Sequence, residues 1–358
     1  MKPFVSVVVP CRNEARFIER SLHSILNSDY PPECLEVIVA DGRSDDGTGT
    51  LLAALAARDP RLRIIDNPAR ITPVALNRAI AAARGEIIVR FDAHAVMPRD
   101  YIRRSVDLLA SSGADNAGGV IRTIAQSSGP FAGPIVAVLS SPFGVGNSAF
   151  RTSRGEAGPR PADTVFGGCW RRELFNRIGG FNERLARSQD IEFNLRIARA
   201  GGTILLDPRI VSDYYARADL ASFWRHNFSN GVWAVLPFAL SDIVPVRPRH
   251  LIPLAFVTAL AASAILPFPW SIAVPAAYAA ANLAASARAA VQNRRPAFLA
   301  LLPIAFSSLH LAYGLGSAWG CVQLIIHKLR KPVNHASKET QTRPSRQPAH
   351  AIEGRKNP

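Results

Sequence analysis

Short apolar runs alternate with helix-periodic segments through the first 110 residues of the chain. The runs are five or six residues long and rich in Val and Ile, which is typical of buried strands. They read FVSVVV, LEVIVA, LRIID and EIIVRF. Between them apolar residues recur at helical spacing, as in the segment from about Glu14 that places Ile18, Leu22 and Ile25 on one face. Strands that alternate with helices form βαβ units, so we predict a Rossmann-like α/β domain with a mainly parallel sheet over residues 1–245.

Cap signals predict where several helices begin and end. Thr72 is predicted as an N-cap, with Pro73 at the first helical position. Ser188 is predicted to cap a later helix that stops at Gly201. Residues 125–163 are rich in Gly, Ser and Pro, and they predict a long loop.

Polar clusters follow three of the predicted strands. They are PCRNE at 10–14, DGRSDDGT at 41–48 and DAHA at 92–95. In a parallel sheet the carboxyl ends of the strands share one edge, and ligands bind there. One such cluster could be an ordinary polar loop, but three at consecutive strand ends predict a site.

Asp92 and His94 stand two positions apart, so the period of a strand puts both on the same side. A carboxylate and an imidazole suit Mg²⁺ or Mn²⁺, with the imidazole favouring Mn²⁺. Two protein ligands suffice when a substrate diphosphate supplies the others. For His94 taken alone, a buried hydrogen-bonded histidine is the alternative.

Two further carboxylates are candidates with ordinary alternatives. Asp41 ends a strand and could accept a hydrogen bond from the N3–H of uracil, although Asp also simply makes turns. Asp190 stands in the first turn of a predicted helix, where the dipole favours the ionised form. Glu192, two residues later, is expected to pair with Arg196 instead of sharing the role of Asp190.

Five ordered segments carry a resemblance to a known family. They are VSVVVPCRNEARFIERSLHSIL, EVIVADGRSDDGT, ALNRAIAAARGEIIVRFDAHA, FGGCWRRELFNRIGGFNE and QDIEFNLRIARAGG. Together they resemble family 2 glycosyltransferases over roughly residues 4–235. The match is closest to the succinoglycan biosynthesis glucosyltransferases of the ExoA group, which also have Asp-Ala-His in place of the usual Asp-x-Asp.

The resemblance implies a GT-A fold, a nucleotide-diphosphate sugar donor and inversion at the anomeric carbon. By position, it implies that Pro10, Glu14 and Asp41 line the nucleotide pocket. Asp92 and His94 would hold the metal and the diphosphate, with Asn77 supporting the pocket beside them. Asp190 would be the catalytic base, taking the proton of the acceptor hydroxyl.

The chain becomes apolar after Leu251 and predicts transmembrane segments over 251–326. Residues 251–268 and 270–287 are each long enough to span a bilayer and carry no charge. Residues 297–326 could form one span or a re-entrant hairpin, and the positive-inside tendency favours the hairpin because a basic tail follows. The tail, 327–358, holds eight Lys/Arg and two acidic residues and is predicted to be disordered.

The net charge of +15 is interpreted beside these segments as a surface that faces anionic lipid. No nucleic-acid-binding module is evident, and four cysteines without paired spacing suggest a reducing, cytoplasmic compartment. A multi-pass enzyme of the inner membrane with a cytoplasmic catalytic domain is therefore expected. Its acceptor would be a polyprenyl-linked glycan in exopolysaccharide or cell-envelope synthesis. The alternatives are a polyprenyl-phosphate sugar synthase and an inactive nucleotide-binding scaffold.

Overall fold

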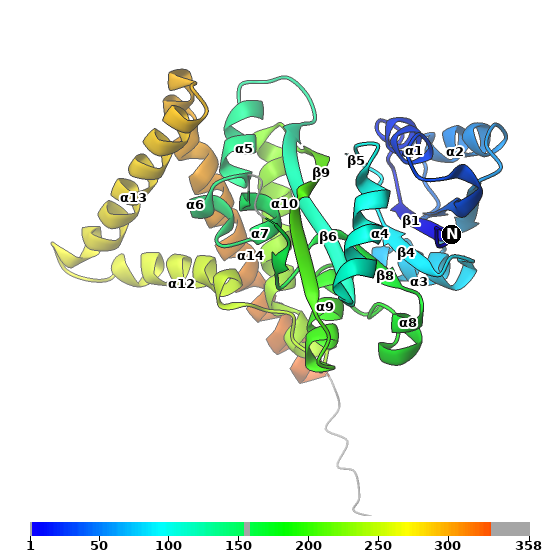
Figure 1. The fold of residues 1–358 in the computed structure, drawn as a ribbon. Coiled ribbons are helices and arrows are strands. Elements are labelled where there is room, and N and C mark those ends of the chain that lie inside the picture. The colour runs from blue at the N-terminus through cyan, green and yellow to red at the C-terminus, as the bar shows by residue number, and fades with distance from the viewer. Residues whose placement is uncertain (1, 154–157, 331–358) are drawn as a thin grey trace, which may run out of the picture.

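The computed structural model describes residues 2–153 and 158–330 of the chain. A single mixed sheet runs through the first 216 residues in the order β3-β2-β1-β4-β8-β6-β9-β5, with β7 beside β9 (Figure 1). The strands are β1 (Val5–Cys11), β2 (Leu35–Asp41), β3 (Leu62–Asp66), β4 (Ile87–Arg90), β5 (Ala95–Val96), β6 (Asn116–Ala125), β7 (Arg160–Pro161), β8 (Phe166–Arg171) and β9 (Ile204–Ala216).

The strands β3, β2, β1 and β4 are parallel, as the sequence predicts. Val7 of β1 pairs with Val37 of β2 and with Val89 of β4, and all three side chains are fully buried. Strands covered on both faces need apolar residues at every position, which explains the continuous Val and Ile runs. Strand β8 is antiparallel to both β4 and β6, so the sheet is mixed.

Helices cover both faces of this sheet. On one face α1 and α4 pack with the apolar cluster around Val7, and on the other α3 and α9 pack with the cluster around Trp170. The helices before residue 245 are α1 (Ile18–Leu26), α2 (Thr48–Ala56), α3 (Thr72–Ala82), α4 (Tyr101–Ser112), α5 (Ala132–Leu139), α6 (Pro142–Val145), α7 (Ala149–Thr152), α8 (Glu173–Ile178), α9 (Gln189–Arg199), α10 (Leu220–Val235) and α11 (Pro237–Leu240), with a 3₁₀ turn η1 (Pro32–Cys34).

Two local predictions are wrong, and a third is confirmed in position only. Residues 125–163 are not a plain loop, because α5, α6 and α7 form there, and α5 buries Ile135 and Val138 against the C-terminal helices. Thr72 is already helical, and the extended residue at the cap position is Ile71. Ser188 does occupy the cap position of α9, but with left-handed backbone (φ 63°) and no capping hydrogen bond from its side chain.

The C-terminal helices are α12 (Pro248–Ser263), α13 (Trp270–Gln292) and α14 (Leu302–Arg330), with a 3₁₀ turn η2 (Pro296–Ala300) before α14. In Figure 1, α12 and α13 project from the body of the protein, whereas α14 runs along α10. The exposed large hydrophobic side chains all lie at or after Ile252, except for Ile64 and Phe238. This is the distribution expected if the C-terminal helices face lipid.

Only α14 among the described helices is both long and apolar enough to cross a membrane, over Leu302–His327. The predicted span at 251–268 corresponds to α12, whose 16 residues extend about 24 Å at 1.5 Å per residue, short of a hydrocarbon core of about 30 Å. The predicted span at 270–287 lies within α13, which is long enough but not sufficiently apolar. The described residues therefore hold one candidate span, and the spans expected at 251–268 and 270–287 stay predictions.

The preferred hairpin for 297–326 is wrong, because α14 is one continuous helix. Small residues let α14 approach α10 closely. A Cβ on Gly316 would collide with the carbonyl oxygen of Phe228, and one on Gly231 with that of Tyr313. Ser317 adds a hydrogen bond from its hydroxyl to the Gly231 carbonyl (3.1 Å). The glycine-rich segment therefore serves close helix packing. The predicted tail beyond Arg330 lies outside the described residues.

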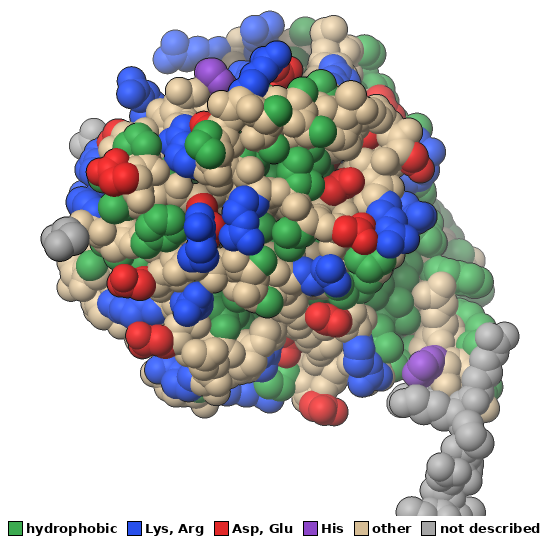
Figure 2. Space-filling view, turned by 90° about the vertical axis from the view of Figure 1, so that its right-hand side faces the viewer, with side chains coloured by type: hydrophobic (Ala, Val, Ile, Leu, Met, Phe, Trp, Pro, Cys, Tyr) green, Lys and Arg blue, Asp and Glu red, His purple; other side chains and the backbone are tan. Residues whose placement is uncertain are grey.

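The face over the N-terminal part of the sheet differs from the C-terminal helices. Figure 2 shows basic and acidic side chains interspersed over it, with hydrophobic side chains gathered toward one margin. A mixed charged surface of this kind is typical of a domain in contact with water.

Candidate functional site

One large cavity joins the sheet to the C-terminal helices. Its volume is about 1240 Å³, and it opens at the edge where β1 and β4 end. Pro10, Glu14, Asp92, His94 and Asp190 line its polar part. Aromatic side chains from α10, α12, α13 and α14 line the other part, namely Trp233, Phe256, Tyr278 and Tyr313. A single space thus connects the strand-end residues with the apolar helices.

The first two polar clusters are tied together at this edge. Asn13 exchanges hydrogen bonds with Asp45, donating to its carboxylate (2.8 Å) and accepting from its backbone N–H (3.0 Å). The hydroxyl of Thr48 accepts the Glu14 N–H (2.9 Å). The parallel register places Cys11 opposite Asp41, so both loops leave the sheet at the same level. The prediction that the polar strand ends meet at one edge is confirmed.

Asp92 faces the cavity beside a buried arginine. The Arg90 guanidinium lies 3.1 Å from the Asp92 carboxylate, and the two side chains are only 10% and 17% exposed. Burial alone would raise the pKa of Asp92, but Arg90 and His94 outweigh it and hold the pKa below its usual value. Asp92 is therefore ionised near neutral pH, as a metal or diphosphate site requires.

His94 is oriented by Glu14. Its Nδ1 lies 3.0 Å from Glu14 Oε1, and its ring meets Tyr214 edge-on at 5.0 Å between centroids. Burial lowers the pKa of His94, but Tyr214, Glu14 and Asp92 outweigh it and raise the pKa to about 10. A carboxylate bonded to one ring nitrogen is the usual support for a histidine that binds metal through the other. Glu14, predicted in the nucleotide pocket, thus lines the cavity and holds His94.

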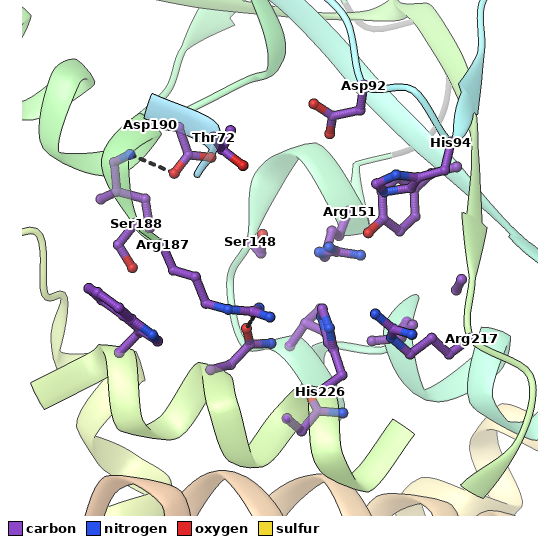
Figure 3. A pocket seen from close by; sticks show the side chains of 18 of the residues that line it. Thr72, Asp92, His94, Ser148, Arg151, Arg187, Ser188, Asp190, Arg217 and His226 are labelled. Atoms are coloured by element: carbon purple, nitrogen blue, oxygen red, sulfur yellow. Dashed lines mark hydrogen bonds between the residues drawn. The ribbon is translucent and has the colours of Figure 1, made fainter. Parts of the chain in front are cut away.

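These residues fit a divalent cation of the kind that borrows substrate ligands. Asp92 and His94 offer one oxygen and one nitrogen toward the same space (Figure 3). The described residues contain no group of three or more His, Cys, Asp or Glu side chains that could hold a metal. A cation held here would need further oxygens from a diphosphate, as Mg²⁺-type sites commonly do. It would also need the His94 ring in its neutral form.

Asp190 enters the cavity from the opposite side. It stands in the first turn of α9, as predicted, and its Oδ1 accepts the N–H of Ile191 (2.9 Å). In Figure 3 Asp190 and Asp92 come from different elements toward one space. Glu192 is buried and bound at both oxygens by Arg196 (2.9 Å each), which confirms the predicted pair. Asp190 is therefore the carboxylate of this helix that can act on a bound molecule.

Two predicted residues do not line the cavity. Asp41 accepts hydrogen bonds from the hydroxyl (2.6 Å) and N–H (3.3 Å) of Ser44, so it shapes the turn after β2. Asn77 on α3 donates to the Phe181 carbonyl (2.8 Å) and accepts its N–H (2.7 Å). Asn77 thus fixes the segment between α8 and α9 and does not stand beside Asp92 and His94. Pro10, the remaining predicted residue, does line the cavity.

The residues that the sequence analysis missed are mainly cationic. Arg90 pairs with Asp92, while Arg151, Arg187, Arg217 and His226 line the middle of the cavity (Figure 3). Arg90 could have been found, because a charged residue inside the apolar run EIIVRF demands a partner. The other four come from separate elements and share no spacing in the sequence.

Comparisons with known proteins bear on the family and the fold of this chain. The family model described as Glycosyl transferase family 2 matches residues 6–178. The chain is 33% identical over 315 residues to the succinoglycan biosynthesis protein ExoA of Rhizobium meliloti (strain 1021), covering 87% of this chain and 92% of that protein.

Two further proteins are similar to more than half of this chain. A Methanococcus voltae protein, dolichyl N-acetyl-alpha-D-glucosaminyl phosphate 3-beta-D-2,3-diacetamido-2,3-dideoxy-beta-D-glucuronosyltransferase, is 26% identical over 64% of this chain and 72% of its own length. The structure of a mannosyltransferase from Pyrobaculum calidifontis in complex with GDP-Man and Mn²⁺ superposes with a TM-score of 0.58. It is 25% identical and covers 89% of this chain and 88% of that one.

Proposed function

Because this chain belongs to glycosyltransferase family 2 and has its GT-A fold, we propose that it transfers a sugar from a nucleotide-diphosphate donor to a lipid-linked acceptor. The proposed donor is UDP-glucose, and the proposed acceptor is a polyprenyl-linked glycan of an exopolysaccharide or envelope pathway. The name of the Rhizobium meliloti relative supports the polysaccharide context, and that of the Methanococcus voltae relative supports a lipid-phosphate acceptor.

The observation that carries the proposal is the continuity of the cavity. Its polar part lies at the strand ends, where nucleotides bind in open α/β sheets. Its other part is lined by Trp233 of α10 and by Phe256 and Tyr278, which lie on α12 and α13, two helices that expose large hydrophobic residues such as Ile252 and Ile272. A water-soluble sugar acceptor would need no such lining, whereas a lipid-linked acceptor can reach the site from the membrane through it.

The site residues then have distinct roles in a single displacement with inversion. Asp190 takes the proton of the acceptor hydroxyl as that oxygen attacks the anomeric carbon. Asp92 and His94 would hold a divalent cation against the donor diphosphate, with Glu14 orienting His94 and Arg90 orienting Asp92. Such a cation, when bound, neutralises charge on the departing nucleoside diphosphate. Pro10 contributes to the nucleotide pocket, while Asp41 and Asn77 act through the loops that they hold.

The enzyme is proposed to work at the cytoplasmic face of the inner membrane. Helix α14 is the candidate span, and α12 and α13 supply exposed apolar surface beside it. The multi-pass arrangement stays a prediction, which labelling of single cysteines at Asn293 and Leu266 from either side of sealed vesicles would test. Accessibility of both positions from the same side would contradict two spans at α12 and α13.

The experiment that tests the function uses membranes that contain the full chain. Radiolabelled UDP- and GDP-sugars are supplied in turn, and label is measured in the lipid extract. We expect one sugar, glucose from UDP-glucose, to enter the lipid fraction. Label that enters only water-soluble products would contradict a lipid acceptor, and product released as polyprenyl phosphate-sugar would establish the synthase alternative. No label from any donor, with nucleotide still bound, would indicate the inactive scaffold.

A further inference from the structure

A cationic cluster lies in the cavity between the carboxylates and the C-terminal helices. Arg151 comes from α7, Arg187 precedes α9, Arg217 follows β9 and His226 is on α10. In Figure 3 these side chains converge below Asp92, His94 and Asp190 and above the ribbons of α10 and α14. Four separate elements therefore bring nitrogen donors to one place.

Positive charge in this cavity exceeds negative charge. Among the described residues, eight arginines and four carboxylates line it. Two of these carboxylates are already engaged, Asp92 by Arg90 and Glu14 by His94. The excess is concentrated at the cluster, where burial and the neighbouring Arg217 lower the pKa of Arg187. Cations that lie close together in a partly enclosed cavity repel one another, and an anion between them stabilises them.

Two nitrogens of the cluster are left without partners. Within the described part of the chain, Nη1 of Arg151 and Nδ1 of His226 are buried and make no hydrogen bond. Burial, together with Arg187, Arg217, Arg151 and His94, lowers the pKa of His226 to about 3, so the ring is neutral and can still donate one N–H. Arg187, by contrast, is held by Asn230 (2.7 Å). Unpaired buried donors in a native fold call for a ligand.

We propose, building on the proposed function, that Arg151, Arg187, Arg217 and His226 form a second anion site that binds the phosphate or diphosphate joining the acceptor to its lipid. Arginine suits this ligand because its planar donors match phosphate oxygens in pairs. The cluster lies between the carboxylates at the sheet edge and α10, and the same cavity is also lined by Trp233 and Phe256. A lipid phosphate has this same order of parts, with a charged group followed by an apolar chain.

The donor diphosphate is the other source of such an anion, and the position of the cluster argues against it. The donor is expected at the ends of β1 and β4, with Asp92 and His94. His226 belongs to α10, which packs along α14, the candidate membrane span. The acceptor phosphate would therefore occupy the membrane side of the cavity while the donor occupies the sheet side.

The test measures binding to the purified full chain in detergent micelles without any donor. The probes are undecaprenyl phosphate, undecaprenyl diphosphate and the uncharged undecaprenol, with UDP and Mn²⁺ measured separately by calorimetry. Arg217→Gln is the main variant, because Arg217 lines the cavity but is exposed, so its replacement should disturb the packing of the fold least. Arg151→Gln is the second, with thermal melting to check its folding. Arg225→Gln is the matched control, on the same helix as His226, exposed and outside the cavity lining.

We expect a phosphorylated lipid to bind the wild type more tightly than undecaprenol does. Arg217→Gln and Arg151→Gln should each weaken that binding by about tenfold or more, as loss of a charged hydrogen bond does. The affinity of both variants for UDP should stay within about twofold of wild type. Arg225→Gln should bind the phosphorylated lipid as tightly as wild type does. Equal binding of undecaprenol, or equal loss of UDP affinity, would overturn the proposal. Since no transfer step is involved, failure of the transferase assay does not decide this result.

Discussion

The two edges of the parallel sheet hold their charged groups in different ways. Where the strands begin, Glu36 is buried and accepts hydrogen bonds from Ser6, Arg84 and Arg63 between 2.7 and 3.0 Å. Ser6 in turn accepts the Gly85 N–H (2.8 Å), so β1, β2, β3 and the approach to β4 are tied together. Where the strands end, Asp92 and Asp190 face a cavity that also holds unpartnered nitrogens among the described residues.

This difference shows what the charges at each edge are for. A buried carboxylate with four donors leaves no capacity for a ligand and ties neighbouring strands together. At Gly85 even a methyl group would lie 2.6 Å from the Ser6 nitrogen, so the chain is closely packed around these hydrogen bonds. The opposite edge keeps carboxylates and guanidinium groups incompletely paired, which costs stability and leaves them free to bind. Substitutions at one edge should therefore change activity, and substitutions at the other should change stability.

The largest effect is expected at Asp190. Asp190→Asn keeps the shape of the side chain and removes its basicity, so transfer should fall on the order of 10²–10⁴-fold. Binding of UDP with Mn²⁺ should stay close to wild type, because Asp190 enters from α9 and not from the nucleotide-facing strand ends. Turnover is measured as label in lipid and binding by calorimetry. A loss of UDP affinity larger than the loss of turnover would assign Asp190 to the donor site instead.

The next effect is expected at the metal pair. Chelator should abolish transfer and Mn²⁺ should restore it better than Mg²⁺, because His94 supplies nitrogen. His94→Ala should lower transfer by roughly 10²-fold, and Glu14→Gln, which loosens the hydrogen bond to His94, by about 10-fold. The measurement is transfer rate against metal concentration for each protein. Full activity of His94→Ala in excess chelator would end the metal assignment.

At the opposite edge the expected effect is on folding. Glu36→Gln should lower the free energy of unfolding by about 2 kcal/mol, since it removes charged hydrogen bonds from a buried site. Burial alone would raise the pKa of Glu36, but Ser6, Arg84 and Arg63 lower it below 4.5. The ionised Glu36 therefore stabilises the fold at any pH above the pKa that it has in the unfolded chain. This stabilisation is lost as the pH falls through the lower pKa that Glu36 has in the folded protein.

Denaturant titrations of Glu36→Gln at several pH values check this account. The difference in the free energy of unfolding between wild type and Glu36→Gln should be largest at neutral pH. It should become smaller as the pH falls below 4.5. Glu33→Gln is the control, because Glu33 is exposed just before the same strand. The role given to Glu36 would be contradicted if this difference in the free energy of unfolding did not depend on pH. It would also be contradicted if Glu33→Gln showed the same difference from wild type.

The smallest effect is expected at Asp41. Asp41→Asn weakens the turn at Ser44, so the apparent KM for the donor should rise by a few-fold while turnover at saturation stays close to wild type. Initial rates over a range of donor concentrations separate the two constants. A fall in turnover with unchanged KM would show that Asp41 does not act on the nucleotide pocket.

Much of the fold could be predicted because its signals are local. The Val and Ile runs identify the parallel strands, and the polar residues after each run identify the edge at which Asp92 and His94 lie. The family resemblance is confirmed by the relatives and by the shared fold, and it is the source of the role proposed for Asp190.

The rest depends on contacts between distant segments. Arg151, Arg187, Arg217 and His226 meet only after α7, α9, β9 and α10 have packed, so no spacing in the sequence reveals their cluster. The continuity of α14 likewise rests on its packing along α10, which an apolar sequence without clear periodicity does not show. The hydrogen bonds of Asn77 to Phe181 could not be predicted either, because the two residues lie more than a hundred positions apart in the chain.

The contrast between the two edges is tested most directly by measuring Asp190→Asn and Glu36→Gln side by side for thermal unfolding and for transfer per folded molecule. We expect Asp190→Asn to unfold at the same temperature as wild type and to transfer almost no sugar into lipid. Glu36→Gln should unfold at a lower temperature, yet its folded molecules should transfer sugar at the wild-type rate. An Asp190→Asn enzyme that keeps turnover within a few-fold of wild type, or a Glu36→Gln enzyme that is fully stable but inactive, would contradict the account.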